Sequence, residues 1–596
     1  MASGFENMSM GRIGRSLALL LVSALAACAH QPVPSGGTTA ARSVQPAADA
    51  PAIPTESAYG SYLAGSLAQR EHDYAAAADY LERSLLQDPN NLELMRRTFL
   101  LRLGEGDFKR ADELARRIAA VDPRAGLPAL ALLVQQLKSG DTAGAAAAAD
   151  HLPQDGLLRF STPLVVAWTK AGQHDEKGAL AGLDRFDKLR GFEQLKLFHL
   201  ALIDDYLGDV DGASRTYKKI IESPDHLNWR TVDMAGTFFE RHERVPEAKA
   251  LYERFLKENP DSSDLVQPSL ARVAAGKVPP APVATVQDGL AEAMFDIAAL
   301  LNQRDTQDLS LLYARLALEL KPKHPLALFL AAEIAEGEQR LTEALATYRA
   351  IDPASAFAWS ARLREAEVLD ELDRVDEAAS ELRAMAAERP SAAQPLIALG
   401  DMLRARNRFA EAVTAYNGAV ARLSPEARYW SLFYSRGIAL ERSGDWPRAE
   451  ADFLHALELQ PDQPLVLNYL GYSWIERREH LDHALKMVER AVELRPNDGY
   501  IVDSLGWAYY QLGSYPQATQ YLERAIELLP EDPTINDHLG DVYWRTGRTA
   551  EARYQWRRAL QFQPEADQVK IIDAKLDKGL TAAPGALAPG VTSSGG

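Results

Sequence analysis

The chain has 596 residues, of which 47% are hydrophobic, so it is long enough for several domains or for one repetitive body with a continuous core. Its formal net charge of -18 argues against nucleic acid or an anionic lipid surface as its main partner. A single cysteine excludes an internal disulfide, and the 12 histidines are scattered, so no metal-binding cluster is predicted.

The N-terminus has the layout of an export signal. Arg12 and Arg15 precede an apolar run from Ser16 to Ala27. As a helix, this run would span roughly 18 Å, which is short of the about 30 Å of hydrocarbon in a bilayer. The run is therefore not predicted to cross the membrane as an anchor.

The apolar run ends in Leu25-Ala26-Ala27-Cys28, which resembles a bacterial lipobox. The resemblance implies cleavage between Ala27 and Cys28 and a covalent lipid on the Cys28 thiol, and no other cofactor is expected. In enterobacterial lipoproteins, an aspartate directly after the cysteine is the signal for retention in the inner membrane, whereas Ala29 stands here. The resemblance thus implies the outer membrane, on its periplasmic face. A plain secretory signal that happens to contain a cysteine is the alternative.

We predict a signal peptide at residues 1–27 and a lipidated, disordered tether at residues 28–55. The tether is rich in Pro, Ala, Ser and Thr and shows no apolar periodicity. A coil of this length has a mean reach on the order of 30 Å, which would hold a folded body off the membrane. The sequence leaves open whether translation starts at Met1, Met8 or Met10.

Small residues then recur at an interval of 34. Gly437, Gly471, Gly506 and Gly540 are 34, 35 and 34 residues apart, and alanine and proline follow them at nearly fixed distances. Antiparallel helices approach closely only where side chains are small, and proline ends the second helix of a pair because it lacks an N–H. The pattern resembles the tetratricopeptide repeat. It predicts an all-α solenoid of about fourteen helix-turn-helix repeats in two superhelical halves.

The register breaks between Pro260 and Ala298, where three prolines occur within four positions. We predict an N-terminal solenoid at residues 56–276, a Pro-rich linker at 277–286, a C-terminal solenoid at 287–578 and a disordered tail at 579–596. Two further helices are expected, one at Leu265 to Ala275 and a solvating C-terminal capping helix at Asp567 to Lys578.

No catalytic residues are predicted, because no H-E-x-x-H, G-x-S-x-G or Walker-type motif occurs. The glycine-rich segment Gly104 to Arg110 falls where a turn between paired helices is expected, which favours a turn over a phosphate site. His480 and His483 could face one another, but a surface turn with one inserted residue is the favoured interpretation.

Aromatic and Asn/Asp side chains recur on the first helices of the last three repeats, which line the concave side of a solenoid. Aromatic rings give a large contact area at low entropic cost, and Asn/Asp can hold an extended peptide backbone. Ile475, Ser504 and His538 take further inward positions. We predict a protein-binding groove formed by Asn468, Tyr469, Tyr472, Asp503, Trp507, Tyr510, Asp537, Asp541 and Trp544. The alternative is that these side chains pack against the neighbouring repeat.

The segment Leu467 to Arg548, with LNYLGYSW, REHLDHAL and DGYIVDSLGW, resembles the C-terminal part of a proteobacterial outer-membrane lipoprotein family. Its members include the lipoprotein partner of the carboxyl-terminal processing protease CtpA. The resemblance implies a non-enzymatic adaptor that holds a periplasmic processing protease and presents peptidoglycan hydrolases to it. A structural or assembly lipoprotein of a pilus, secretion or exopolysaccharide export system is the alternative, and a cryptic cell-wall hydrolase is a third hypothesis.

The proposed lipid site gives a first test. Cys28→Ala removes the only thiol that can take the lipid, so we expect an unlipidated protein whose folded body is unchanged. Metabolic labelling with a fatty-acid analogue measures the modification, and label that persists in the variant would contradict the assignment.

Overall fold

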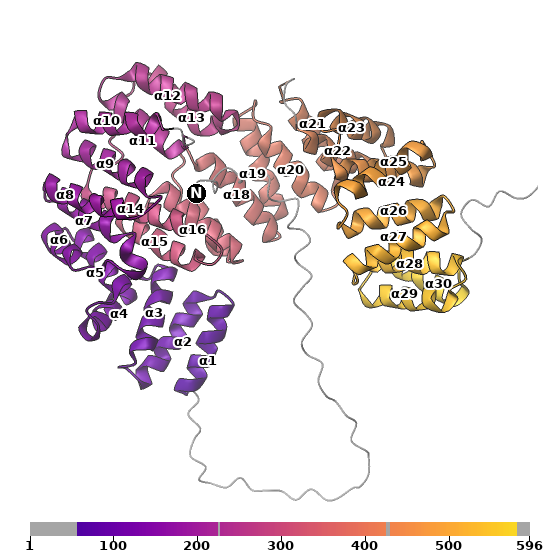
Figure 1. Ribbon diagram of the computed structural model, residues 1–596, viewed down its shortest axis with the longest axis horizontal. Helices are drawn as coiled ribbons and strands as arrows, with labels where there is room; N and C mark the ends of the chain where they lie inside the picture. Colours follow the sequence, from indigo (N-terminus) through magenta and orange to yellow (C-terminus); the bar gives the residue numbers. More distant parts are fainter. Residues whose placement is uncertain (1–56, 224–226, 425–428, 581–596) are drawn as a thin grey trace, which may run out of the picture. The chain divides into compact units, whose positions relative to one another are not determined.

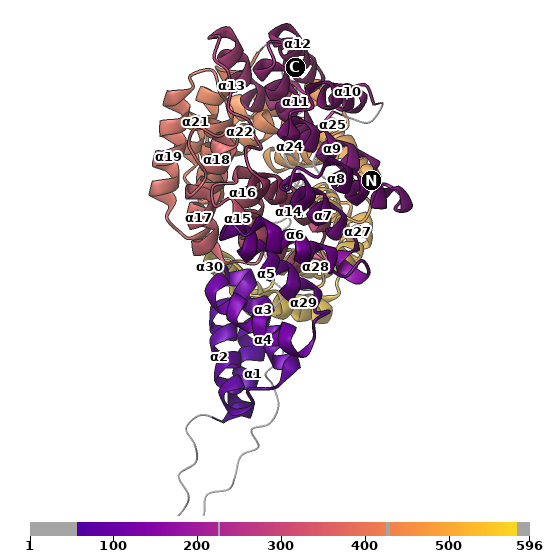
Figure 2. The ribbon, with the colours of Figure 1, turned by 90° about the vertical axis from the view of Figure 1, so that its left-hand side faces the viewer.

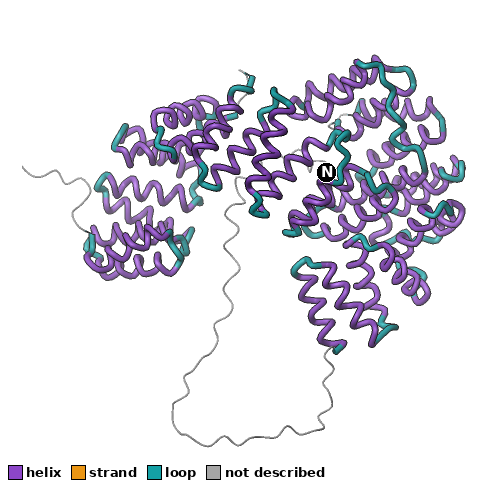
Figure 3. The backbone as a smooth tube through the Cα atoms, turned by 180° about the vertical axis from the view of Figure 1, so that it is seen from behind, coloured by secondary structure: helices purple, strands orange, loops and turns teal. Residues whose placement is uncertain are grey.

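The computed structural model describes residues 57–223, 227–424 and 429–580, and these ranges hold thirty α-helices and no strand (Figure 1; Figure 3). Most of the helices follow one another as antiparallel pairs, so the predicted all-α solenoid is confirmed. The predicted signal peptide, Cys28, the tether up to residue 55 and the tail from residue 581 lie outside the described residues. The chain divides into two compact units, Met1–Leu372 and Asp373–Gly596.

Within its described residues, the first unit holds eight helix pairs and two single helices, α13 and α18. The pairs run from α1 with α2 to α11 with α12, and continue after α13 with α14 and α15, then α16 and α17. The bounds are α1 (Ala58–Arg70), α2 (Tyr74–Gln87), α3 (Leu92–Glu105), α4 (Phe108–Val121), α5 (Gly126–Lys138), α6 (Thr142–Asp150), α7 (Thr162–Ala171), α8 (Glu176–Leu183), α9 (Glu193–Leu207), α10 (Val210–Ile221), α11 (Trp229–Arg241), α12 (Val245–Glu258), α13 (Ser263–Ala274), α14 (Val286–Leu301), α15 (Gln307–Leu320), α16 (Pro325–Gly337), α17 (Leu341–Arg349) and α18 (Ala358–Glu371).

Aspartates begin the second helix in each of the first five pairs. Asp73, Asp107, Asp141, Asp175 and Asp209 stand 34 residues apart, and each accepts a hydrogen bond from the backbone N–H three residues on. The carboxylate satisfies a donor that the first turn of a helix leaves without an intrahelical partner. These caps confirm the 34-residue register in the part of the chain where its sequence signature is weakest.

The boundary between the two units does not coincide with the linker predicted at residues 277–286. It lies between α18 and α19, the two helices of the repeat predicted around Ala366. The reason is that α14 and α15, predicted to begin a second solenoid, pack back onto the first one. Helix α14 packs against α7 and α9, and α15 packs against α3 and α5.

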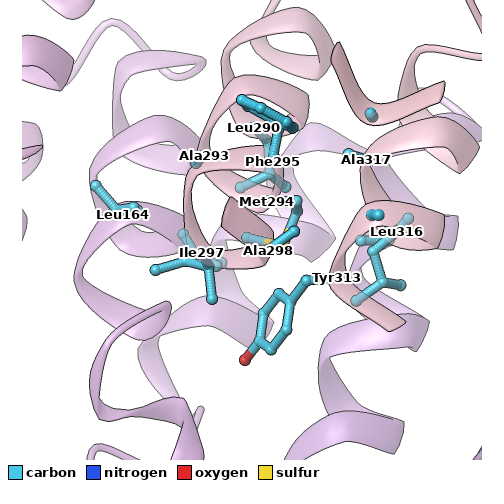
Figure 4. Close-up of a cluster of buried hydrophobic side chains, with 14 of the residues drawn as sticks. Leu164, Leu290, Ala293, Met294, Phe295, Ile297, Ala298, Tyr313, Leu316 and Ala317 are labelled. Carbon is cyan, nitrogen blue, oxygen red and sulfur yellow. The ribbon is translucent and has the colours of Figure 1, made fainter. Parts of the chain in front are cut away.

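Apolar side chains hold α14 in this place. Figure 4 shows Met294 and Ile297 of α14 in one buried cluster with Leu164 of α7 and Tyr313 of α15. Gly289 lets the backbone of α14 reach α7, because a Cβ at this position would lie 2.2 Å from the indole ring of Trp168. First helices of the pairs line the inner side of a solenoid. The inner side of these early repeats is therefore filled by the chain's own helices.

A buried charged network also fastens α14. Trp168 Nε1–H donates to Nδ1 of His199 at 3.0 Å, and His199 Nε2 lies 2.9 Å from Asp296 Oδ2. Arg230 of α11 pairs with Asp296 and, at 2.7 Å, with Glu292. Burial and the Arg230 guanidinium lower the pKa of His199 to about 3, so the ring is neutral and donates from Nε2. Removing one partner of such a pair costs about 3–5 kcal/mol, so the network fixes α14 in one position.

The described part of the second unit begins with the single helix α19, continues as five helix pairs and ends with the single helix α30. Helices α13 and α30 confirm the two extra helices predicted outside the repeats. The bounds are α19 (Val375–Glu388), α20 (Gln394–Ala405), α21 (Phe409–Val420), α22 (Trp430–Arg442), α23 (Trp446–Leu459), α24 (Pro464–Arg477), α25 (Leu481–Leu494), α26 (Gly499–Gln511), α27 (Tyr515–Leu528), α28 (Pro533–Arg545), α29 (Thr549–Gln561) and α30 (Ala566–Lys578).

In the five helix pairs of the second unit, a central glycine lies where the two helices cross. A Cβ on Gly506 would lie 2.7 Å from Cγ of Leu522 on α27, and one on Gly540 would lie 2.5 Å from the indole of Trp556 on α29. Both contacts are closer than real Cβ atoms approach, so the large side chain of the second helix packs directly on the backbone of the first.

This crossing predicts the effect of a bulky residue. Gly506→Leu should separate α26 from α27 and lower the free energy of unfolding by about 1–3 kcal/mol through overpacking, as measured by urea denaturation. Gly337→Leu is the matched control, because Gly337 is exposed at the end of α16 and has no close neighbour. Equal losses in the two variants would contradict the assigned register.

Candidate functional site

The nine residues predicted to form a binding groove lie on three successive first helices, α24, α26 and α28, and α26 packs against both of the others. The residues after the central glycines are Tyr472, Trp507 and Asp541. Trp507 contacts α24 and α28, the neighbouring first helices, whereas Asp541 also contacts α29, the second helix of its own pair. We call the side formed by these positions and their neighbours the first-helix face. The sequence therefore brings the nine residues together, as predicted.

Trp507 lies at the centre of the first-helix face. Its ring stacks on Tyr510 with centroids 4.6 Å apart and an interplanar angle of 13°, and on His538 of α28 at 3.9 Å and 17°. Its Nε1–H donates to Glu476 of α24 at 2.8 Å. One indole thus links three helices through stacking and a charge-assisted hydrogen bond.

Asp503 and His538 form a buried ion pair between α26 and α28. Both carboxylate oxygens of Asp503 lie 3.0 Å from Nδ1 of His538, and the two side chains are 10% and 12% exposed. Burial opposes protonation of the ring, but the carboxylates of Asp503, Asp537 and Asp541 outweigh it and raise the pKa of His538 above its usual value. An imidazolium at this place also stacks favourably on the electron-rich face of Trp507.

At the α24 end, the tyrosines of the first-helix face contact carboxylates. Tyr469 donates to Glu441 of α22 at 3.3 Å, and its ring lies 5.1 Å from that of Phe453. Burial and the nearby Glu476 carboxylate raise the pKa of Tyr472, so its hydroxyl stays protonated. Asn468 Oδ1 is buried and has no hydrogen-bond partner among the described residues.

At the other end, the capping helix α30 closes the face. Lys575 Nζ lies 2.8 Å from carboxylate oxygens of both Asp537 and Asp541. Asp541 also accepts from Trp556 Nε1 at 2.9 Å, and burial raises its pKa although Lys575 opposes the shift. Trp544 lies against the backbone of Gly579. These side chains are therefore largely satisfied within the protein.

The nine residues therefore also join neighbouring repeats, which was the alternative interpretation. Trp507, Tyr472 and Asn468 remain partly exposed, whereas Asp503, Tyr510 and Asp541 are buried. That the face binds a partner stays a prediction. Sequence reasoning missed Glu476 and Lys575. Glu476 stands one helical turn after Tyr472, and Lys575 follows a small residue, Ala574, that lies 34 positions after Gly540, so both could have been found by extending the register.

The remaining candidate sites are structural. Gly104 to Arg110 spans the turn from α3 to α4, with Gly106 at φ 87° and Asp107 as the helix cap. The rings of His480 and His483 lie against Trp474, at 4.9 and 5.7 Å. Within the described ranges, His, Cys, Asp and Glu side chains form no group of three or more that could hold a metal ion.

Two open hollows lie on the first unit. One is lined by residues that include Tyr74 and Arg340, and the other by residues that include Lys138 and Glu319. Lys138 pairs with Glu319 at 2.5 Å, and Tyr74 donates to Glu338 at 2.9 Å. In the part of the chain that is described, no helix is both long enough and apolar enough to span a bilayer.

Known proteins share this arrangement of helix pairs. Tetratricopeptide repeat families match residues 363–428, 434–499 and 473–537. The chain carries tetratricopeptide repeats. The matches begin in α18 of the first unit and run through the second unit to the start of α28, so they include α24 and α26 of the first-helix face. Repeats of this kind form scaffolds for protein interaction. No enzymatic family is indicated.

Two curated relatives of these repeats come from bacteria. A TPR repeat-containing protein of Pseudomonas aeruginosa is 30% identical over 193 residues, which are 32% of this chain and 32% of the relative. A lipoprotein NlpI homolog of Haemophilus influenzae is 36% identical over 102 residues, which are 17% of this chain and 32% of the relative. The chain thus spans about a third of the length of the curated relatives it matches. Among solved structures, a chain of the APC/C hetero-tetramer Cut9–Hcn1 is similar to this one. The match covers 88% of this chain and 97% of that chain, with 17% sequence identity and a TM-score of 0.36.

The Asp503–His538 pair predicts a pH dependence. Because the folded-state pKa of His538 is raised, its stabilising charge is fully present below about pH 6.5, its unfolded value, and is lost as the pH rises through the folded value. His538→Gln keeps an N–H donor without the charge, so we expect it to lose about 1 kcal/mol at pH 6 and little at pH 9.

Urea denaturation across this pH range measures the difference. The matched control is His455→Gln on α23, whose side chain is 45% exposed. A penalty for His538→Gln that does not change with pH would show that the ring is neutral in the folded protein.

Proposed function

We propose that the protein is a non-enzymatic, periplasm-facing lipoprotein adaptor that holds a carboxyl-terminal processing protease together with peptidoglycan hydrolases. The observation that carries the proposal is the first-helix face, where aromatic, acidic and amide side chains of three successive repeats form one row. Trp507 and Tyr472 in this row keep part of their surface in solvent.

The inner surfaces of the two units differ in a way that supports a binding role for the second unit. In the first unit, α14 and α15 occupy the inner side of the early repeats, so that surface is used for internal packing. In the second unit, the row on α24, α26 and α28 is held rigid by Asp503–His538 and by Lys575, while its aromatic edges stay accessible. A rigid aromatic row is suited to bind a protein because little side-chain entropy is lost on association.

The proposed location at the membrane is based on the lipobox-like segment that ends at Cys28. The Haemophilus influenzae relative is named as a lipoprotein, which supports an anchored form. Anchoring would confine the adaptor and its partners to one surface and so raise their effective concentration.

Affinity capture from detergent-solubilised envelope tests the proposal. The protein should recover a carboxyl-terminal processing protease, and Trp507→Ala combined with Tyr472→Ala should weaken that recovery. A loss of about 2 kcal/mol, typical of a central aromatic contact, corresponds to roughly a thirty-fold lower affinity. Quantitative mass spectrometry provides the measurement.

The matched control is Tyr554→Ala on α29, since Tyr554 is 66% exposed and lies outside the first-helix face. Circular dichroism establishes that each variant is folded. Absence of any protease, or equal recovery with all three proteins, would refute the proposal. Capture of a secretin or another outer-membrane export component instead would favour an assembly lipoprotein.

A further inference from the structure

Helix α1 exposes four large apolar side chains. Tyr59, Tyr62, Leu63 and Leu67 are 72%, 41%, 50% and 49% exposed. Their spacing of three or four residues places them on one side of the helix, which we call the α1 face. Helix α2 packs on another side of α1, and Figure 2 shows the two as the last helices at one end of the first unit.

The repeat register explains why part of this face is uncovered. Leu67 stands two residues after Gly65, and the equivalent residues Leu101, Ala508 and Val542 are 4%, 0% and 0% exposed. In those repeats the second helix of the preceding pair packs against the first helix, as α2 does against α3. Before α1 there is no described helix to do so.

The C-terminal end of the solenoid is built differently. There α30 takes the place of a further first helix, and its side chains include Asp567, Lys570 and Lys575. Its large exposed apolar side chain is Ile571, at 54%. A terminal repeat needs a polar outer side to remain in water, and α30 supplies one, whereas α1 does not.

The charge of α1 and the composition of the preceding segment indicate which kind of partner could cover the α1 face. Although the chain carries -18, α1 contains no acidic residue and ends with Arg70. The Arg97 guanidinium lies 5.4 Å from the ring centre of Tyr62. Residues 28–56 contain five prolines and three large aliphatic residues, a pattern that does not predict an amphipathic helix able to cover α1.

We propose that the α1 face lies on a lipid bilayer, with its tyrosine and leucine side chains at the boundary between headgroups and acyl chains. Tyrosine and leucine suit this boundary, and Arg70 can reach the headgroups from the end of the helix. This inference rests on the proposed function in one respect: the lipid anchor would raise the effective concentration of the α1 face at the bilayer. Cys28 and Ala58 stand only 30 positions apart, so the proposed anchor would keep α1 within reach of the bilayer that holds the lipid.

The net negative charge of the chain determines which class of lipid we expect the α1 face to bind. Anionic headgroups repel a chain of -18, so the α1 face should prefer neutral lipid. This separates it from a polybasic segment, whose binding requires anionic lipid.

Vesicle flotation tests the proposal without the anchor. The chain from residue 28 with Cys28→Ala keeps every described residue and is mixed with vesicles of phosphatidylcholine and phosphatidylethanolamine. We expect a measurable bound fraction, a partition at least tenfold lower after Leu63→Ser and Leu67→Ser, and no increase when phosphatidylglycerol is added. The matched control is Leu454→Ser with Leu512→Ser, residues 43% and 36% exposed in the second unit.

Absence of binding by the parent protein, or equal partition of the parent and the Leu63/Leu67 variant, overturns the proposal. Sedimentation velocity without lipid supplies the second measurement. A dimer that the Leu63/Leu67 variant dissociates would assign the face to a second copy and also overturn it. Lipid labelling of Cys28 and capture of the protease are independent measurements, so failure of the proposed function is distinguishable from failure of this inference.

Discussion

The close approach of two helix backbones at a small residue is the constraint on which the rest of this structure depends. At Gly506 and Gly540 there is no room for a Cβ, so Leu522 and Trp556 pack directly on the facing backbone. The same contact fixes the rotation of the first helix about its axis. This rotation places Trp507, the residue after Gly506, beside α24 and α28, and it places Asp541, the residue after Gly540, in contact with both α29 and α30.

The two units use the same kind of helix pair but treat its inner side differently. In the first unit, α14 returns to the early repeats and is held there by apolar contacts and by the network around Arg230 and Asp296. Buried charges tolerate little displacement, so this docking is specific as well as tight. In the second unit, the inner positions contact one another between successive helices and leave the edges of Trp507 and Tyr472 in solvent.

Much of this could be predicted from the sequence because the signal is local. A 34-residue period in small residues determines which segments pair, and it identifies α24, α26 and α28 as the first helices of successive pairs. The return of α14 could not be predicted in this way. It depends on contacts such as those of Gly289 with Trp168 and Asp296 with His199, which are about 100 residues or more apart in the chain, and no local pattern encodes such a pairing.

The proline-rich segment at residues 277–286 was misleading for a related reason. Prolines indicate where helices stop, but they do not indicate whether the chain then departs or turns back. The extent to which the first-helix face is buried likewise could not be predicted from the sequence. The ion pair of Asp503 with His538 and the contact of Lys575 with Asp541 form only when neighbouring repeats stack.

The span of these contacts along the chain has a kinetic consequence. Tyr74 bonds Glu338 across 264 residues, and Arg315 bonds the Gly104 carbonyl across 211, whereas the hydrogen bonds of the first-helix face span 15 to 38 residues. Closing a long loop costs entropy before any contact repays it. The second unit can therefore fold from any repeat outward and fray from its ends, whereas the first unit also needs slow contacts between segments more than 200 residues apart.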